Sequence, residues 1–218
     1  MTNKVVLEIF SDYTWPWCYF ITGCIERLKN DYEVTTRWIA YPLNPSIPDD
    51  GLPLEKHFSD CSEEEINEKK AKWKAAADAA ALPLGERSYT YRSRLAHELS
   101  KWSESQGKGD EFHQAVFKAY FVDGKNIGKI PILIDLARSI ELSVKEAQKV
   151  LENRTYKEAV DSDWSYSLAV DPEYIPSLKI NGKLLVNPQR YALFDQFMKD
   201  NRVTRRTHRW TQTMRVTS

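Results

Sequence analysis

A single cysteine, Cys18, follows the segment Trp15-Pro16-Trp17 near the start of the chain. Pro16 fits the first turn of a helix, so the pattern predicts that Cys18 lies at a helix N-terminus. There, unpaired backbone N–H groups and the helix dipole stabilise a thiolate, the nucleophilic form of cysteine. Free cysteines are also commonly buried as small apolar side chains. The residues therefore indicate either a reactive monothiol at Cys18 or an inert buried one.

The remaining cysteines and histidines give little support to other cysteine or metal chemistry. Cys18, Cys24 and Cys61 form no close pair, which argues against a disulfide framework and against a cysteine-rich metal site. Cys18 and Cys24 are six residues apart on one predicted helix, so their side chains point in different directions. His57 and His113 have no metal-ligand spacing. No metal site is predicted.

The elements that would position Cys18 follow the order strand, helix, strand. The apolar, β-branched stretch Val5–Phe10 predicts a strand, and apolar residues at helical spacing predict a helix over Cys18–Leu28. A second strand is predicted at Val34–Ala40. A strand, a helix and a strand in this order imply two parallel strands joined by a right-handed crossover.

The middle of the chain is predicted to be helical. Ser62 and Glu65 have the spacing of a capping box at the start of a long helix. Helices are predicted at residues 62–81, 92–105, 110–121, 131–140, 144–152 and 156–169. No strand is predicted between residues 62 and 169.

Strands return near the end of the chain. Ser177–Ile180 and Lys183–Val186 flank Asn181-Gly182, a strong signal for a two-residue hairpin, and Pro188 opens a last helix that runs to about Met198. The fold class is therefore α/β, a thioredoxin-like fold with an inserted all-helical domain. The expected thioredoxin-like domain comprises residues 1–60 and 170–200, the inserted helical domain residues 61–169, and a basic tail residues 201–218.

Composition predicts a globular protein, with 218 residues of which 42% are hydrophobic and 28% charged. There is no apolar run of signal-peptide or membrane-span length, so we expect a cytoplasmic protein without a membrane partner. The tail contains five arginines and no acid. These arginines are not part of a nucleic-acid-binding motif, so they give only weak support for nucleic-acid binding. We favour a tail that is solvated or that packs on the acidic body of the protein. The sequence does not fix an oligomeric state.

The residues around Cys18 resemble the DsbA family of thioredoxin-fold proteins, in particular its FrnE-like branch. That branch has a motif S-D-x-x-C-P-W-C-Y after the first strand, and residues 11–19 here read SDYTWPWCY. Five further segments resemble it in the same order: RWIAYPLNPSIPDDG, YRSRLAHEL, VFKAYFVDGKNI, YIPSLKING and the Asn187-Pro188 turn. The resemblance implies a thioredoxin-like fold and thiol-disulfide oxidoreductase ancestry.

The chain departs from this family at the first position of the motif. The family's first cysteine is the exposed nucleophile and its second cysteine resolves the mixed disulfide, whereas here Trp15 takes the first position and Cys18 the second. Dithiol exchange needs both sulfurs. We therefore expect this exchange to be absent or weak, with Cys18 as the one candidate catalytic residue.

The resemblance also implies a substrate cleft between the motif, a cis-proline loop at Ile175-Pro176 and the helical domain. Trp15 at the exposed position suggests a surface for an apolar or aromatic ligand. Trp17 is more typical of a core aromatic. A histidine such as His97, at the start of a helix, is more often structural. The candidate substrate-binding residues are Trp15, Pro16, Trp17, Ile175, Pro176 and His97.

Three functions stay open at this point. Cys18 could act as a monothiol, with a protein client or glutathione as the partner. A glutathione-dependent isomerase or transferase is a second alternative, because 2-hydroxychromene-2-carboxylate isomerases and kappa-class transferases share the inserted-helix architecture; they use a serine hydroxyl that Trp15 cannot supply. The third is a non-enzymatic peptide-binding or chaperone-like protein. No cofactor is required by the residues, and glutathione is left open.

Overall fold

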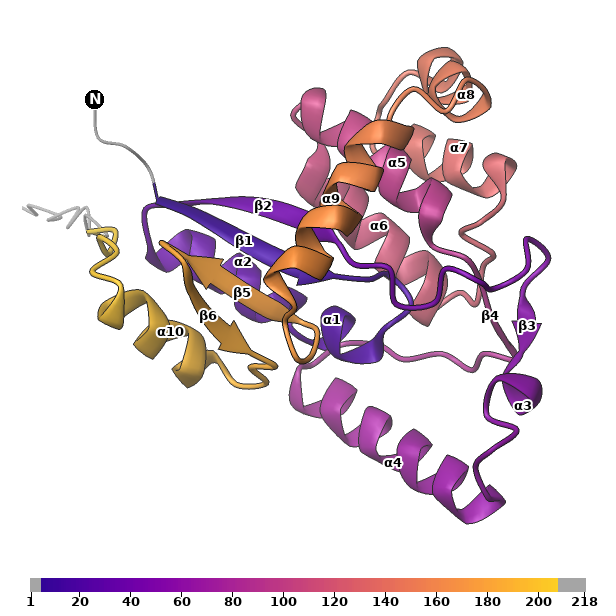
Figure 1. The fold of residues 1–218 in the computed structure, drawn as a ribbon, viewed down its shortest axis with the longest axis horizontal. Helices are drawn as coiled ribbons and strands as arrows, with labels where there is room; N and C mark the ends of the chain where they lie inside the picture. Colours follow the sequence, from indigo (N-terminus) through magenta and orange to yellow (C-terminus); the bar gives the residue numbers. More distant parts are fainter. Residues whose placement is uncertain (1–4, 208–218) are drawn as a thin grey trace, which may run out of the picture.

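The computed structural model describes residues 5–207, and its centre is a four-stranded mixed sheet (Figure 1). The strands are β1 (Val5–Ser11), β2 (Val34–Ala40), β5 (Ser177–Ile180) and β6 (Lys183–Val186), in the spatial order β2-β1-β5-β6. β1 runs parallel to β2 and antiparallel to β5. The parallel pair and the predicted late hairpin are both confirmed.

The hairpin between β5 and β6 shows why its sequence predicts it well. Asn181 and Gly182 have φ values of 49° and 81°, so both turn residues occupy the left-handed region. A two-residue turn of this kind matches the twist of paired strands, and Asn-Gly tolerates it best. The pairing Leu178↔Leu185 places one leucine of each strand side by side.

The first helix differs from the prediction of one helix over residues 18–28. It is divided into α1 (Pro16–Phe20) and α2 (Thr22–Asp31), with Ile21 between them. The Thr22 hydroxyl donates a hydrogen bond to the Tyr19 carbonyl at 2.8 Å. A threonine hydroxyl that bonds back to the preceding turn bends a helix, and the apolar pattern does not register this local contact.

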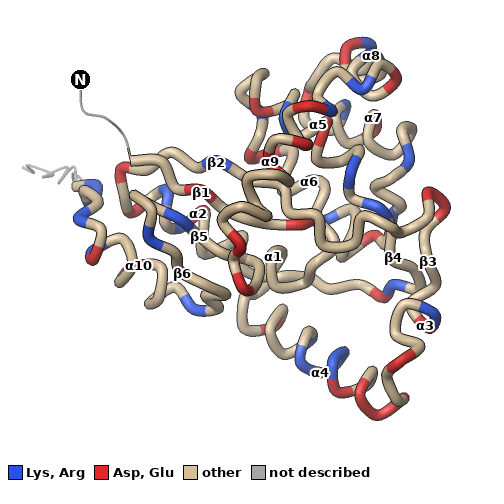
Figure 2. The backbone as a smooth tube through the Cα atoms, viewed as in Figure 1, with Lys and Arg blue, Asp and Glu red and all other residues tan. Residues whose placement is uncertain are grey.

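Helices fill the middle of the chain as predicted. α4 (Glu63–Ala79) begins at a complete capping box, in which Ser62 and Glu65 each bond the other's backbone N–H. The other helices are α3 (Leu54–His57), α5 (Arg94–Ser105), α6 (Gly109–Phe121), α7 (Ile130–Ser139), α8 (Val144–Glu152), α9 (Lys157–Val170) and α10 (Tyr191–Asp200). The acidic start of α4 and its basic middle are visible in Figure 2. The fold is α/β with a helical block between β2 and β5.

The prediction that residues 62–169 contain no strand is wrong in one place. β4 (Tyr89–Thr90) pairs antiparallel with β3 (Leu52–Pro53) to form a second, two-stranded sheet. Two residues are too few to show an alternating pattern, and the pairing depends on distant contacts: the Thr90 and Tyr120 hydroxyls are 3.0 Å apart. Tertiary packing, and not local preference, forms this strand.

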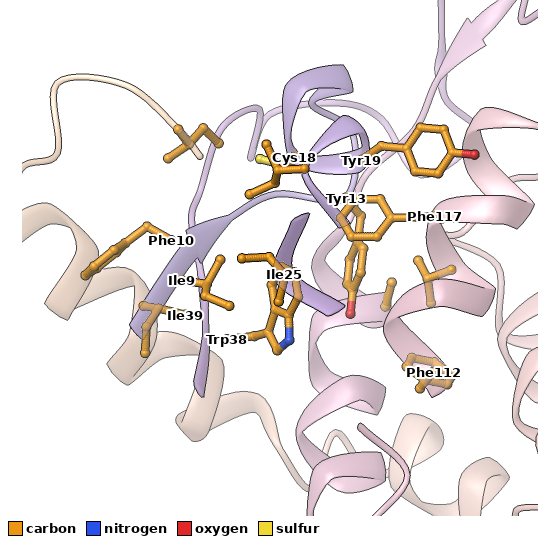
Figure 3. Packing of buried hydrophobic residues seen from close by; sticks show 14 of the residues in the cluster. Ile9, Phe10, Tyr13, Cys18, Tyr19, Ile25, Trp38, Ile39, Phe112 and Phe117 are labelled. Atoms are coloured by element: carbon orange, nitrogen blue, oxygen red, sulfur yellow. The ribbon is translucent and has the colours of Figure 1, made fainter. Parts of the chain in front are cut away.

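One cluster of buried side chains joins the main sheet to the helices. Figure 3 shows Ile9 of β1, Trp38 of β2, Ile25 of α2 and Phe117 of α6 within this cluster. α9 packs on β2, and α1 contacts both α4 and α6. The turn between β1 and α1, which leads into the Trp-Pro-Trp-Cys motif, is therefore enclosed by the core on one side and by helices on the other.

Candidate functional site

The turn that leads into α1 is held by the buried carboxylate of Asp12. The backbone N–H and the hydroxyl of Thr14 both donate to Asp12 Oδ1 at 2.7 Å. Ser93 at the start of α5 donates to Oδ2 at 2.8 Å. Burial alone raises the pKa of Asp12, but the contacts with His97 and Thr14 outweigh it and lower the pKa. Asp12 therefore stays ionised and fixes the turn, a role that the sequence motif did not reveal.

Trp15 and Pro16 start helix α1 as the sequence predicts. Trp15 is the N-cap residue, with φ of −93° and ψ of 118°, and Pro16 lies in the first helical turn. The Cys18 N–H donates to the Trp15 carbonyl at 3.0 Å. Trp15 and Trp17 are half-buried, whereas Pro16 is buried. The indole at the first motif position is therefore partly open to solvent.

The Cys18 side chain is fully enclosed, with an exposed fraction of 0% (Figure 3). Burial raises the pKa of its thiol to about 12, although hydrogen bonds with Ser11 and with the Asp12 backbone act in the opposite direction. At pH 7 such a thiol is ionised in only about one molecule in 10⁵. Burial thus dominates over the helix N-terminus, and the inert interpretation of Cys18 is the one that the geometry favours.

The other cysteines do not complete a dithiol. Within residues 5–207, which include all three cysteines, no disulfide forms, and Cys24 and Cys61 are half-buried free thiols. Burial raises the pKa of Cys24, with Arg27 acting against it. Over the same range, no three His, Cys, Asp or Glu side chains are grouped to hold a metal ion.

A groove of about 730 Å³ opens beside the motif, between α1, α2, the end of α4 and the start of α10. We call it the Trp17 groove. Its apolar lining consists of Trp17, Phe20, Ile21, Ala76, Ala79 and Ala80, with Cys24 among them. Arg27, Arg190 and Tyr191 line it as well, and the Arg27 guanidinium lies 3.8 Å from the centre of the Tyr191 ring. Of the predicted substrate-binding residues, only Trp17 lines this groove.

The loop before β5 lies at the same end of the sheet as the motif. The pairing Phe10↔Ser177 places Pro176 beside the point where the chain leaves β1, and the Ile175–Pro176 peptide bond is cis. Ile175 and Pro176 are both buried, and the Pro176 carbonyl accepts a hydrogen bond from the Asn187 N–H at 2.9 Å. Tyr174, directly before them, is exposed.

His97 lies in the interior and not on a surface open to substrate. Its ring stacks on Tyr13 with centroids 4.6 Å apart, and its Nε2 lies 3.6 Å from Asp12 Oδ2. That nitrogen has no hydrogen-bond partner among the described residues. His97 lies on the inner face of α5, where it contacts Tyr13 and Asp12, the two residues before Thr14 in the turn.

A second buried histidine, His113 of α6, continues this polar row. Its Nδ1 lies 2.5 Å from the Tyr13 hydroxyl and its Nε2 lies 3.3 Å from Glu104 Oε1. Burial lowers the pKa of His113, with the nearby Glu104 carboxylate acting against it. The contacts fit a neutral imidazole that accepts from Tyr13 and donates to Glu104. Through Tyr13, His97 and His113 the turn before the motif is held against α5 and α6. The sequence analysis gave these contacts no role.

Comparisons with known proteins agree with this geometry. A family model described as a DSBA-like thioredoxin domain matches residues 6–199. The chain therefore belongs to the family of DSBA-like thioredoxin domains, as the motif resemblance implied. The uncharacterized protein YwbO of Bacillus subtilis is 28% identical over 161 residues, which cover 71% of this chain and 75% of YwbO.

Solved structures show the same fold. A probable DsbA oxidoreductase from Streptomyces coelicolor matches with a TM-score of 0.82 and 20% identity, covering 90% of this chain and 89% of that one. A 2-hydroxychromene-2-carboxylate isomerase matches with a TM-score of 0.70 and 15% identity over 90% and 96% of the two chains. The cytosolic disulfide reductase DsbM of Pseudomonas aeruginosa, solved with GSH, gives 0.67 and 13% over 90% and 98%.

The start of the predicted basic tail packs on the body, since Arg206 donates from Nε to the carbonyls of Lys29 and Tyr32 at 3.0 and 2.9 Å. Residues 208–218 of that tail lie outside the described range. None of the helices within residues 5–207 combines the length and the hydropathy needed to cross a bilayer.

Proposed function

We propose that this protein is a binding member of its family, which captures an extended apolar peptide segment in the Trp17 groove and does not perform dithiol exchange. The observation that carries the proposal is the contrast between two neighbouring parts of the motif. Cys18 is sealed in the core, whereas Trp17, one residue earlier, lines a groove of about 730 Å³. The only thiol of the motif is therefore inaccessible to a substrate, whereas Trp17 of the same motif offers a surface for binding.

The thiol chemistry of the motif lacks both of the groups it needs. Trp15 stands at the nucleophile position, and an indole cannot form a mixed disulfide. Cys18 has no exposed surface and a pKa of about 12, so neither access nor ionisation supports attack on a disulfide. A monothiol mechanism at Cys18 would require this part of the core to open in every cycle.

The groove has the size and the lining of a site for a peptide segment. Its volume lies within the range of about 300–1,000 Å³ that is typical of ligand sites. Trp17, Phe20 and the alanines at the end of α4 give an apolar lining, on which aromatic or leucine side chains can pack. Arg190 adds positive charge, as does Arg27, whose Nε lies 3.7 Å from Asp31 Oδ2. An apolar segment that carries a carboxylate fits this combination best.

The test is fluorescence anisotropy with a labelled, unstructured peptide rich in Leu and Phe and ending in a free carboxylate. Ala76→Asp places a charge in the lining of the groove and should weaken binding by at least about tenfold. Ala75→Asp is the matched control, because Ala75 is the exposed neighbour on the same helix and is not part of the lining. Equal binding by both variants would refute the groove as the site.

Two further assays separate the rival functions. A titration with reduced glutathione tests the isomerase or transferase alternative, since saturable glutathione binding that Ala76→Asp leaves intact would favour a site near Trp15 over the groove. Catalysed insulin reduction by the unmodified chain that is lost in Cys18→Ser would favour the monothiol. Peptide binding without either activity is the expected result.

A further inference from the structure

A second cavity, of about 410 Å³, lies apart from the motif at the N-terminal ends of α5 and α7. We call it the α5–α7 pocket. Its lining includes six charged or glycine residues: Asp49, Arg92, Arg94, Gly128, Lys129 and Arg154. Four of these carry a positive charge, and Asp49 is the only acid among the lining residues. None of them belongs to the Trp-Pro-Trp-Cys turn or to the Trp17 groove.

One wall of the pocket is built around the buried carboxylate of Glu98. Arg94 donates from Nε to Glu98 Oε1 at 2.6 Å, and Arg154 donates from Nε to Oε2 at 2.7 Å and from its Nη2 to Oε1 at 2.6 Å. The Glu98 side chain is 0% exposed. Arg94 Nη1 also lies 2.7 Å from Asp161 Oδ1, and Lys157 pairs with the same carboxylate. The three cations and two carboxylates of this cluster together keep one excess positive charge. Arg94 is itself buried, so the wall is fixed in position.

Two other cations that line the pocket have weakly held partners. Arg92 Nη1 lies 2.8 Å from Asp49 Oδ1, and Lys129 Nζ lies 2.6 Å from Asp50 Oδ1. The side chains of Asp49 and Asp50 are 80% and 94% exposed, and they belong to the loop before β3 that appears red in Figure 2. Ion pairs this exposed contribute little to stability. An incoming anion can therefore take the place of these carboxylates at low cost.

The backbone at the start of α7 completes the pocket. A Cβ atom on Gly128 would lie 3.2 Å from the Arg92 carbonyl and 3.1 Å from Asn126 Oδ1, so glycine permits this close approach. Lys129 is the N-cap of α7, and no described side chain caps that helix end. The positive end of the helix dipole therefore faces the same region as Arg92 and Lys129. Four cations and this helix end therefore line the same cavity.

We propose that the α5–α7 pocket binds a small phosphorylated ligand. The phosphate oxygens replace the Asp49 and Asp50 carboxylates on Arg92 and Lys129, while Arg154 lines the same cavity. Guanidinium groups match phosphate geometry with paired N–H donors, which favours phosphate over a single carboxylate. The volume leaves room for an attached group of about the size of a small sugar.

Calorimetric titration of the full chain with ribose 5-phosphate, at fixed ionic strength, tests the proposal. Arg92→Gln should weaken binding by about tenfold, because it removes a charge-assisted donor. Asp49→Asn should tighten binding by about threefold to tenfold, because it removes the resident carboxylate that competes with the ligand. Arg138→Gln, an exposed arginine on α7 outside the pocket, is the control and should leave binding unchanged.

A general surface-charge effect would give the same two signs, so the discriminating comparison is with Arg138→Gln, which removes the same charge outside the pocket. Equal weakening by Arg92→Gln and Arg138→Gln would overturn the proposal, as would the absence of binding to both the unmodified chain and Asp49→Asn. Succinate, titrated in parallel, should bind at least about tenfold more weakly, and equal affinity would show that the pocket does not select phosphate. None of these variants alters Glu98, and unchanged circular dichroism confirms that they fold.

Discussion

Replacing Trp15 by cysteine should restore thiol-disulfide exchange to this protein. Trp15 is the half-buried N-cap of α1, and the Cys18 N–H bonds to its carbonyl, so an introduced sulfur lies at the start of the helix in a C-x-x-C arrangement. In this arrangement the first thiol has a pKa between about 3.5 and 7.5 instead of about 8.5. Its ionised fraction at pH 7 then rises from about 3% to at least about a quarter. The corresponding fraction for the buried Cys18 is about 10⁴-fold smaller.

The assay is insulin reduction at pH 7 with a fixed concentration of thiol reductant. The unmodified chain should match the uncatalysed rate, and Trp15→Cys should accelerate it. The double variant Trp15→Cys/Cys18→Ser has the attacking sulfur but no second one, so it should accumulate a mixed disulfide that mass spectrometry detects. Cys18→Ser alone should behave like the unmodified chain.

Two results would refute this reasoning. Acceleration by the unmodified chain that disappears in Cys18→Ser would show that a thiol with a pKa of about 12 still reacts, and that burial does not control this site. A Trp15→Cys variant that folds, as judged by circular dichroism, but stays inactive would show that the surrounding cleft, and not the missing sulfur, limits the chemistry.

Three further predictions concern stability. Glu98→Gln leaves two guanidiniums without their buried counter-charge and should lower the free energy of unfolding by about 3 kcal/mol in urea titrations, whereas the exposed Glu152→Gln should change it by less than about 0.5 kcal/mol. Ser62→Ala removes the cap of α4 and should cost about 1 kcal/mol by the same measurement. Burial depresses the pKa of His113, so the unfolded chain takes up a proton before the folded one does, and the urea midpoint should fall as the pH drops below about 6.5; a midpoint that rises there would contradict this sign.

The elements that the sequence predicted well are those determined by local chemistry. β2 has the bounds that its β-branched run predicts, and the hairpin turn follows from the tolerance of Asn181 and Gly182 for positive φ. The division between α1 and α2 was missed because the apolar pattern continues across Ile21, where the Thr22 hydroxyl bonds to the Tyr19 carbonyl. The pair β3–β4 was missed because two residues carry no periodicity.

The charged residues around the motif were harder to predict, because burial and partners decide their roles. Asp12 and His97 are polar residues that the sequence could not place inside the protein; their burial depends on Ser93 and Tyr13, which arrive from other elements. For Cys18, the motif indicates two opposing effects on the thiol pKa, the helix N-terminus and burial, but not which of them is larger. Only the enclosure of the sulfur shows that desolvation is the larger.

The Trp17 groove could not be predicted from the sequence, because its lining residues lie far apart in the chain. The same distance allows peptide binding to be tested separately from the thiol chemistry at positions 15 and 18. Its walls come from α1, from Ala76 in α4 and from Arg190 at the start of α10, so more than one hundred residues separate the last two. No local spacing connects them. Because Ala76 lies in α4, outside the turn around Asp12 and Cys18, a charge at position 76 can block the groove without changing the residues at positions 15 and 18. The double variant Trp15→Cys/Ala76→Asp should therefore lose peptide binding and yet still exchange disulfides with a small substrate such as oxidised glutathione. Loss of both activities together, in a folded protein, would mean that groove and motif form a single site.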